Sequence, residues 1–522
     1  MIFRSPHPDV VIPEVPLTPL LLQAAARRPE KPAFIEGPSG RVLTYGQWAS
    51  AVRAGAYGLS ARGFRKGDVF AIFSPNLPEY AVAFHAVSLA GGATTTVNPT
   101  YTVQELSAQL QDCRARYLLT IPQFLDKALE AAQIAGVQET FVFGQAPGAT
   151  TFATLLEKEG PLAGVDIDLR KDVVALPYSS GTTGLPKGVM LTHYNLVANL
   201  HQILGAIHTI QEDDVFVGVL PFFHIYGLMV IMNAGLMSGS TVVTLPRFEL
   251  TSFLETLQKY GVTFAHVVPP IALALAKHPS VEQYDLSRLR ALFSGAAPLG
   301  EAVTRACAER LGCVVMQGYG LTETSPGTHV SPSDPALIKP GAVGPCVPNT
   351  ECKIVDLVRG VAMPSGDLGE ICVRGPQVMK GYLGRPDATA AMIDVEGWLH
   401  TGDIGYADPD GTLHVVDRVK ELIKYKGLQV APAEIEAVLL SHPAVADAAV
   451  VPTPDEEAGE VPKAFLVLKG EATPEEIMAY VAERVAPHKR VRRVEIIGQI
   501  PKSLSGKILR RVLVQQERER SL

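Results

Sequence analysis

Up to about residue 340, segments with helical spacing of apolar residues alternate with short runs that are apolar throughout. Thr18 and Pro19 are typical of an N-cap and a first-turn proline, and they predict a helix over residues 20–28. The apolar runs predict buried strands at 69–73, 117–121, 173–176, 241–245 and 264–268. This alternation is typical of layered α/β structure with a mostly parallel sheet.

The pattern changes after about residue 341, where Gly, Pro and Asp separate short β-rich runs at 352–355, 369–374, 398–404 and 412–416. These runs predict a smaller, more antiparallel subdomain. A last block predicts helices at 432–440 and 474–485 and strands at 446–451, 464–468 and 494–497. We therefore expect layered α/β subdomains over 1–340, a β-rich subdomain over 341–418 and a small α+β domain over 419–522.

Composition excludes several classes of protein. The 522 residues are 47% hydrophobic and 19% charged, with a net charge of −7, which suits a globular protein and lacks the basic excess of a nucleic-acid binder. The longest apolar stretch, 264–276, contains His266 and two prolines and is shorter than the roughly 18 residues of a membrane span. The N-terminus has no signal-peptide pattern, and the six cysteines form no Cys-x-x-Cys pair, so we expect a cytoplasmic protein with reduced, packed thiols.

One glycine-rich segment carries the strongest chemical signal. Residues 178–188 are YSSGTTGLPKG, whose hydroxyls, backbone N–H groups and single lysine suit a polyphosphate. A Walker A loop requires Gly-Lys where this chain has Pro186-Lys187, and it opens into a helix, whereas runs typical of strands flank this loop on both sides. A Walker-type ATPase is therefore disfavoured, and a flexible linker does not explain the Pro-Lys pair.

Seven further motifs follow in order along the chain: PFFHIYG (221–227), SGAAPL (294–299), GYGLTE (318–323), GEICVRG (369–375), WLHTGD (398–403), DRVKELIKYKG (417–427) and PKSLSGK (501–507). Together with the loop, they resemble the adenylate-forming acyl-CoA synthetases, which include 4-coumarate:CoA ligases, fatty acyl-CoA synthetases and firefly-type luciferases. Around His224 and Lys424 the chain is most similar to bacterial 4-coumarate or cinnamate:CoA ligases. The resemblance implies an enzyme that uses ATP and Mg²⁺ to form an acyl-adenylate, releasing pyrophosphate, and then an acyl-CoA thioester, releasing AMP.

The resemblance also implies a nucleotide site. The positions that correspond to it are Ser179, Ser180, Gly181, Thr182, Thr183, Gly184, Lys187, Ala296, Ala297, Gln317, Gly318, Tyr319, Gly320, Thr322, Asp403, Arg418 and Lys507. Tyr319 is expected to stack on adenine, Asp403 to accept both ribose hydroxyls, and Glu323 to hold Mg²⁺. Lys507 is the implied catalytic cation between the carboxylate and the α-phosphate, and its acetylation, as in some relatives, is a hypothesis.

The other implied sites serve the acid and CoA. His224 is expected to position the carboxylate and then to aid thiol attack. The acyl pocket corresponds to His224, Tyr226, Val230, Phe293, Gly295, Gly318, Gly320 and Pro326. Lys420 is the implied hinge about which a mobile C-terminal domain exchanges Lys507 for a second face that binds CoA. The CoA positions are Arg247, Lys424, Lys426 and Gly427.

Several alternatives remain open from the sequence. The expected substrate is an aryl acid of the 4-coumarate or cinnamate type, but an apolar pocket also buries a medium-chain fatty acid. Val230 is bulkier than the usual plant residue, and Gly327-Thr328 replaces apolar residues, so ring-substituent preference is open. An acyl-AMP-forming enzyme without CoA transfer and a catalytically silent nucleotide-binding protein are further alternatives, although Lys507, Glu323 and Asp403 argue against the second. A monomer or a homodimer is expected, with no nucleic-acid partner and no membrane span.

Overall fold

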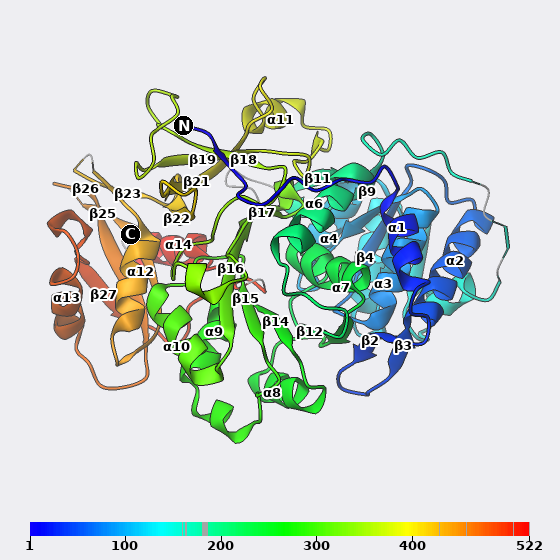
Figure 1. Cartoon of the computed structure of the whole chain (residues 1–522), viewed down its shortest axis with the longest axis horizontal. Coiled ribbons are helices and arrows are strands. Elements are labelled where there is room, and N and C mark those ends of the chain that lie inside the picture. Colours follow the sequence, from blue (N-terminus) through cyan, green and yellow to red (C-terminus); the bar gives the residue numbers. More distant parts are fainter. Residues whose placement is uncertain are drawn as a thin grey trace.

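The computed structural model describes residues 1–520 except 159, 162–163, 180–185, 427, 456 and 505, with side chains as far as Glu517. Figure 1 shows two α/β regions side by side, the first mostly blue and cyan and the second mostly green. A smaller sheet in yellow-green lies along one side of both, and the orange and red C-terminal module lies beside the green region.

The first sheet has a parallel centre and an antiparallel edge. Its strands, in spatial order, are β10 (Tyr178–Ser179), β11 (Lys187–Thr192), β9 (Val173–Ala175), β5 (Ala93–Thr96), β4 (Val69–Phe73), β6 (Ala115–Thr120), β7 (Glu139–Val142) and β8 (Thr150–Thr151), with β20 (Gly381–Tyr382) paired to β11. Strands flank the glycine-rich loop on both sides, as predicted, because β10 and β11 pair across it.

The second sheet is parallel except at its two ends. Its order is β17 (Gly327–Val330), β16 (Val314–Gly320), β15 (Ala291–Ser294), β14 (Phe264–Val267), β12 (Val215–Gly218), β13 (Thr241–Thr244), β2 (Pro32–Glu36) and β3 (Val42–Thr44). Because β2 and β3 precede the first sheet in the chain, the two α/β regions are interleaved, and one cluster of buried apolar side chains spans both.

Helices pack around these two sheets. They are α1 (Leu17–Ala25), α2 (Tyr45–Ala61), α3 (Pro78–Leu89), α4 (Val103–Asp112), α5 (Leu125–Ala135), α6 (His193–Ala206), α7 (Ala234–Ser238), α8 (Leu250–Lys259), α9 (Pro269–Lys277) and α10 (Glu301–Leu311), with a π-helical segment at Tyr226–Asn233 before α7. The predicted position of the first helix was wrong by three residues at each end. Thr18 is not its N-cap, because the side chain is buried and its hydroxyl hydrogen-bonds His85 and Ser88 of α3.

The third sheet is fully antiparallel, as the β-rich pattern predicted. Its order is β1 (Phe3–Arg4), β18 (Glu351–Val355), β19 (Gly369–Arg374), β21 (Leu399–Ala407) and β22 (Leu413–Arg418), with α11 (Pro386–Met392) between β20 and β21. The pairing of β1 with β18 ties the N-terminus to this sheet.

The C-terminal module has its own sheet and apolar core. Its strands are β23 (Ile423–Tyr425), β24 (Leu428–Val430), β25 (Val445–Asp455), β26 (Gly459–Leu468) and β27 (Arg493–Ile496), and its helices are α12 (Pro432–Ser441), α13 (Pro474–Ala482) and α14 (Arg510–Arg520). The observed elements confirm the predicted fold class of layered α/β structure, a β-rich sheet and a smaller α+β module. Helix α14 was not predicted, because eight of its eleven residues are polar or charged and its three apolar residues are consecutive.

Candidate active site

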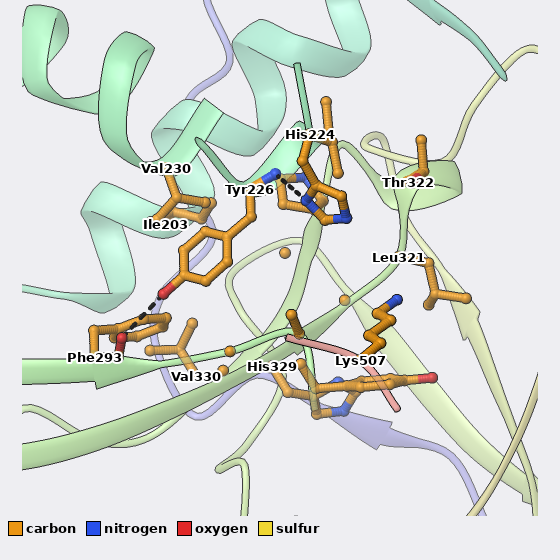
Figure 2. Close-up of a pocket in the computed structure, with 18 residues that line it drawn as sticks. Ile203, His224, Tyr226, Val230, Phe293, Leu321, Thr322, His329, Val330 and Lys507 are labelled. Carbon is orange, nitrogen blue, oxygen red and sulfur yellow. Dashed lines mark hydrogen bonds between the residues drawn. The ribbon is translucent and has the colours of Figure 1, made fainter. Parts of the chain in front are cut away.

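The site lies where strands β15 and β16 end, at the carboxyl edge of the second sheet, the position at which open α/β sheets bind ligands. A cavity of about 580 Å³, counted together with its mouth, is lined by Ile203, His224, Ile225, Tyr226, Val230, Phe293, Gly295, Ala296, Gly318, Tyr319, Gly320, Leu321, Thr322, Pro326, Gly327, His329, Val330 and Lys507. Figure 2 shows Ile203, Val230, Phe293 and Val330 around one end of it and Thr322 and Lys507 at the other.

The apolar end of the cavity depends on glycines. A Cβ at Gly295 would stand 2.9 Å from Tyr226 Cε1, and one at Gly318 would stand 2.5 Å from Phe293 Cζ. A Cβ at Gly320 would lie 1.9 Å from the Pro326 carbonyl oxygen. The two aromatic rings therefore pack directly on backbone, and the Tyr226 hydroxyl donates to the Phe293 carbonyl oxygen at 3.0 Å. The structure brings all the predicted acyl-pocket residues together around this cavity.

The imidazole of His224 is held in one orientation. The backbone N–H of Tyr226 donates to His224 Nδ1 at 3.2 Å, so the neutral ring carries its proton on Nε2. Burial, and after it the nearby Lys507 ammonium, lowers the pKa of His224 to about 3. His224 is therefore a neutral hydrogen-bond donor near pH 7.

Asp403 and Arg418 meet across two antiparallel strands. They are directly paired residues of β21 and β22, which explains how side chains fifteen positions apart in sequence become partners. Arg418 Nε lies 3.2 Å from Asp403 Oδ1, and the Tyr319 hydroxyl donates to Asp403 Oδ2 at 2.7 Å. Burial raises the pKa of Asp403, and the Arg418 guanidinium opposes that rise. Tyr319 therefore connects the cavity wall to this carboxylate.

Glu323 lies next to the edge of the glycine-rich loop. Its carboxylate is buried, and Oε1 accepts a hydrogen bond from the Tyr382 hydroxyl at 2.8 Å. The ring of Tyr382 also lies 5.4 Å from Lys187 Nζ, because β20 pairs with β11 directly after the loop. The arrangement places a carboxylate and a lysine near the same loop, as a magnesium–phosphate site requires.

Lys507 reaches the cavity from the C-terminal module. Its loop lies against the start of α9, where a Cβ on Gly506 would stand 2.9 Å from Val268 Cγ2, and Gly506 has a φ of +77°. Burial, followed by the Arg418 guanidinium, lowers the pKa of the Lys507 ammonium, while Asp403 and Glu323 act in the opposite direction. Lys507, the only cation among the described residues of the lining, therefore interacts with the carboxylates of Asp403, Glu323 and Glu421.

Other predicted site residues lie outside the cavity. Ala297 is absent from its lining, and the amide of Gln317 brackets the backbone of Leu299 instead, at 3.0 and 3.1 Å. Arg247, Lys420, Lys424 and Lys426 are exposed and do not line it, and Lys426 pairs with Glu457. Ser179 and Lys187 border the loop, whereas Ser180, Gly181, Thr182, Thr183, Gly184 and Gly427 lie outside the described residues.

Sequence reasoning missed several residues of this region, Val330 of the cavity lining among them. Ile203 projects from α6 into the cavity, His329 lies beneath Tyr319 with ring centroids 5.9 Å apart, and Tyr382 bonds Glu323. None of these residues lies in a quoted motif. Tyr382 belongs to β20, which pairs with β11 directly after the glycine-rich loop. The pairing of β16 with β17 brings His329 beside Tyr319. A hairpin signal after the GYGLTE motif was the one clue in the sequence to this contact.

The six cysteines are all buried and free, as predicted. Within the described chain, no helix combines the length and the apolar run that crossing a bilayer requires.

Comparisons with known proteins show the family of the chain. A model of the AMP-binding enzyme family matches residues 21–383, and a model of the AMP-binding enzyme C-terminal domain matches residues 434–507. The chain is 44% identical to 4-coumarate–CoA ligase 5 of Oryza sativa subsp. japonica and to 4-coumarate–CoA ligase 2 of Petroselinum crispum, in each case over 98% of this chain and 96% of the relative.

Solved structures extend the similarity to the fold. ATP-bound MatB from Rhodopseudomonas palustris superposes with a TM-score of 0.87 at 29% identity, covering 96% of this chain and 98% of that one. The anthranilate CoA ligase AuaEII in complex with anthranoyl-AMP gives a TM-score of 0.90 at 26% identity, covering 97% and 98%. These matches confirm the resemblance that the motifs indicated, and the chain belongs to the AMP-binding enzyme family.

Proposed function

We propose that this protein is an ATP-dependent acid:CoA ligase that activates an aryl acid of the 4-coumarate or cinnamate type. It forms an acyl-adenylate with release of pyrophosphate, and then an acyl-CoA thioester with release of AMP. The relatives named 4-coumarate–CoA ligase, at 44% identity over nearly the whole chain, support both the reaction and the class of acid.

One observation carries the proposal. Lys507 lies at the polar end of an otherwise mostly apolar cavity, on the same side as Thr322 and across from the neutral imidazole of His224. An acid bound with its ring among Val230, Phe293 and Val330 then presents its carboxylate to this cation. This arrangement pairs both the apolar and the charged part of the acid.

The first reaction follows from that placement. A carboxylate oxygen attacks the α-phosphorus of ATP, and the bond from that phosphorus to the pyrophosphate oxygen breaks. Lys507 stabilises the negative charge that gathers on the α-phosphate, and the His224 Nε2–H orients the carboxylate. Asp403 receives the ribose hydroxyls, with Arg418 and Tyr319 holding its two oxygens in place.

Glu323 is the residue that fits a magnesium ion. It is a buried carboxylate whose hydrogen-bond partner, the Tyr382 hydroxyl, is neutral, and hard cations bind carboxylate and phosphate oxygens. A bound Mg²⁺ supplies charge neutralisation of the polyphosphate there. Residues 179–187 are proposed to hold the phosphates themselves.

The second reaction needs a different face of the C-terminal module. CoA sulfur attacks the acyl carbon, and the bond to the AMP oxygen breaks. Lys424 and Lys426 are exposed away from the cavity, so they reach it only after a rotation, for which Lys420 is the proposed hinge. Arg247 and Gly427 are proposed to contact CoA after that rotation.

The proposal also includes the domain boundaries 1–340, 341–418 and 419–522, a cytoplasmic location, and a monomer or homodimer as the oligomeric state.

An acid panel with ATP, Mg²⁺ and CoA tests the function when pyrophosphate, AMP and thioester are followed separately. We expect 4-coumarate or cinnamate to give all three products in equal amounts. AMP without thioester indicates an acyl-AMP-forming enzyme, a preference for octanoate moves the substrate to medium-chain fatty acids, and no pyrophosphate from any acid overturns the proposal.

A further inference from the structure

Among the described residues, the apolar end of the cavity has no side chain with a free hydrogen-bond donor. It is formed by Ile203, Val230, Phe293 and Val330 and by glycine backbone. The Tyr226 hydroxyl already donates to the Phe293 carbonyl oxygen at 3.0 Å. Both ring nitrogens of His329 are occupied, Nδ1 by the Thr328 hydroxyl at 3.0 Å and Nε2 by Cys346 Sγ at 3.3 Å. A hydroxyl on the far side of a bound aryl ring therefore finds an acceptor in the Tyr226 oxygen but no free side-chain donor among the described residues of this lining.

Directly behind that lining lies a buried imidazole. His266 has no exposed surface, and it lies in β14 in register with Phe293 of β15. Its ring centroid is 5.7 Å from that of Phe293 and 6.0 Å from that of Tyr226, two of the aromatic side chains of the cavity wall.

Neither ring nitrogen of His266 has a hydrogen-bond partner among the described residues. Buried polar groups are almost always paired, so a histidine with two unpaired nitrogens in an apolar surrounding requires an explanation. Its neighbours on the other sides, Phe216 and Phe264, are apolar aromatic residues that offer none.

Burial lowers the pKa of His266 to about 3. The ring is therefore neutral, with one N–H donor and one lone pair. A phenolic hydroxyl matches this pair of groups, since it both donates and accepts a hydrogen bond.

We propose that His266 is a specificity-determining residue that binds the distal hydroxyl of a hydroxyaryl acid. This inference rests on the proposed acid:CoA ligase function. His266 does not line the cavity and packs against Tyr226 and Phe293, so the proposal includes a rotation of one of these rings that admits the hydroxyl. A fatty acid or an unsubstituted aryl acid leaves both nitrogens of His266 unpaired, so the preferred acid carries a hydroxyl at the ring position farthest from the carboxylate.

The test compares 4-coumarate with cinnamate, which differ only in that hydroxyl. We expect the wild-type enzyme to favour 4-coumarate in kcat/KM, roughly 5- to 100-fold, the range set by one buried hydrogen bond. His266→Leu should lower the 4-coumarate to cinnamate ratio of kcat/KM to about one or below. His266→Gln keeps a donor and an acceptor and should retain part of the preference.

Phe264→Leu provides the matched control. The ring centroids of Phe264 and His266 lie 4.9 Å apart, and Phe264 is absent from the cavity lining. The variant should lower the melting temperature without changing the ratio of the two acids. The role of His266 is overturned if the wild-type enzyme prefers cinnamate, or if His266→Leu leaves the ratio of the two acids unchanged. In either case, formation of the thioester still supports the proposed acid:CoA ligase function. An enzyme that yields no AMP from either acid overturns the proposed function, and the inference with it.

Discussion

At the scale of single residues, the sequence identifies the side chains of the site, whereas the fold determines the surroundings of each side chain. The motifs pointed to Asp403, Tyr319 and Lys507 separately, and the structure shows Asp403 bonded to Tyr319 at 2.7 Å with Lys507 nearby. The neutral state of His224 could not be predicted from the sequence either. Burial and the Lys507 charge determine its pKa, and no motif encodes them.

Lys507→Ala should abolish ATP–pyrophosphate exchange, by at least about 100-fold, since the α-phosphate loses its cation. Thioester formation from supplied acyl-AMP should persist, because Lys507 belongs to the first reaction alone. Lys502→Ala in the same loop is the control, since Lys502 pairs with Asp447 and does not line the cavity. Equal loss of both reactions in Lys507→Ala would contradict the division of the two steps between two faces.

At the scale of elements, strands were easier to predict than their partners. The runs at 69–73 and 369–374 match β4 and β19 to the residue, whereas their pairing with β6 and β21 depends on contacts far apart in sequence. Helix α14 has little helical apolar pattern and was missed; in the structure Leu513 packs in a small apolar cluster and Arg510, in its first turn, pairs with Glu436.

Arg510→Ala should lower the free energy of unfolding of the C-terminal module by about 3–5 kcal/mol. Arg510 Nη2 lies 2.8 and 2.7 Å from the two oxygens of Glu436, and Nη1 lies 3.0 Å from Glu421, next to the proposed hinge. The variant leaves the buried Glu436 carboxylate without its ion-pair partner.

Thermal unfolding and limited proteolysis measure this effect, with cleavage expected first in the C-terminal module. Arg305→Ala breaks the exposed pair with Glu301 and should cost only about 0–1 kcal/mol. Similar melting temperatures for the two variants would show that the Arg510 network adds little to stability.

At the scale of the whole molecule, several histidines are buried as neutral groups. Burial lowers the pKa of His85, His224 and His266 to about 3 and that of His193 to about 4, from 6.5. Between these values and pH 6.5 the unfolded chain binds protons that the folded chain does not. Stability from these groups is complete above pH 6.5 and is lost as the pH falls below it.

We therefore expect the free energy of unfolding to fall by about 1.4 kcal/mol per pH unit for each such histidine as the pH decreases from 6 to 5. Denaturant unfolding across this range measures the slope. His193→Asn should reduce the slope. A flat profile between pH 7 and pH 5 would contradict the buried neutral state.

The sequence by itself determined the fold class, the family and the residue types of the chemistry, because apolar periodicity and contiguous motifs are local properties of the chain. Only the tertiary structure decided which of these residues share a cavity, as when β15, β16, α6 and the Lys507 loop converge. It also decided which polar groups are left unpaired, such as His266 behind the cavity wall. Both outcomes depend on packing and on dielectric surroundings, which arise from segments distant in sequence.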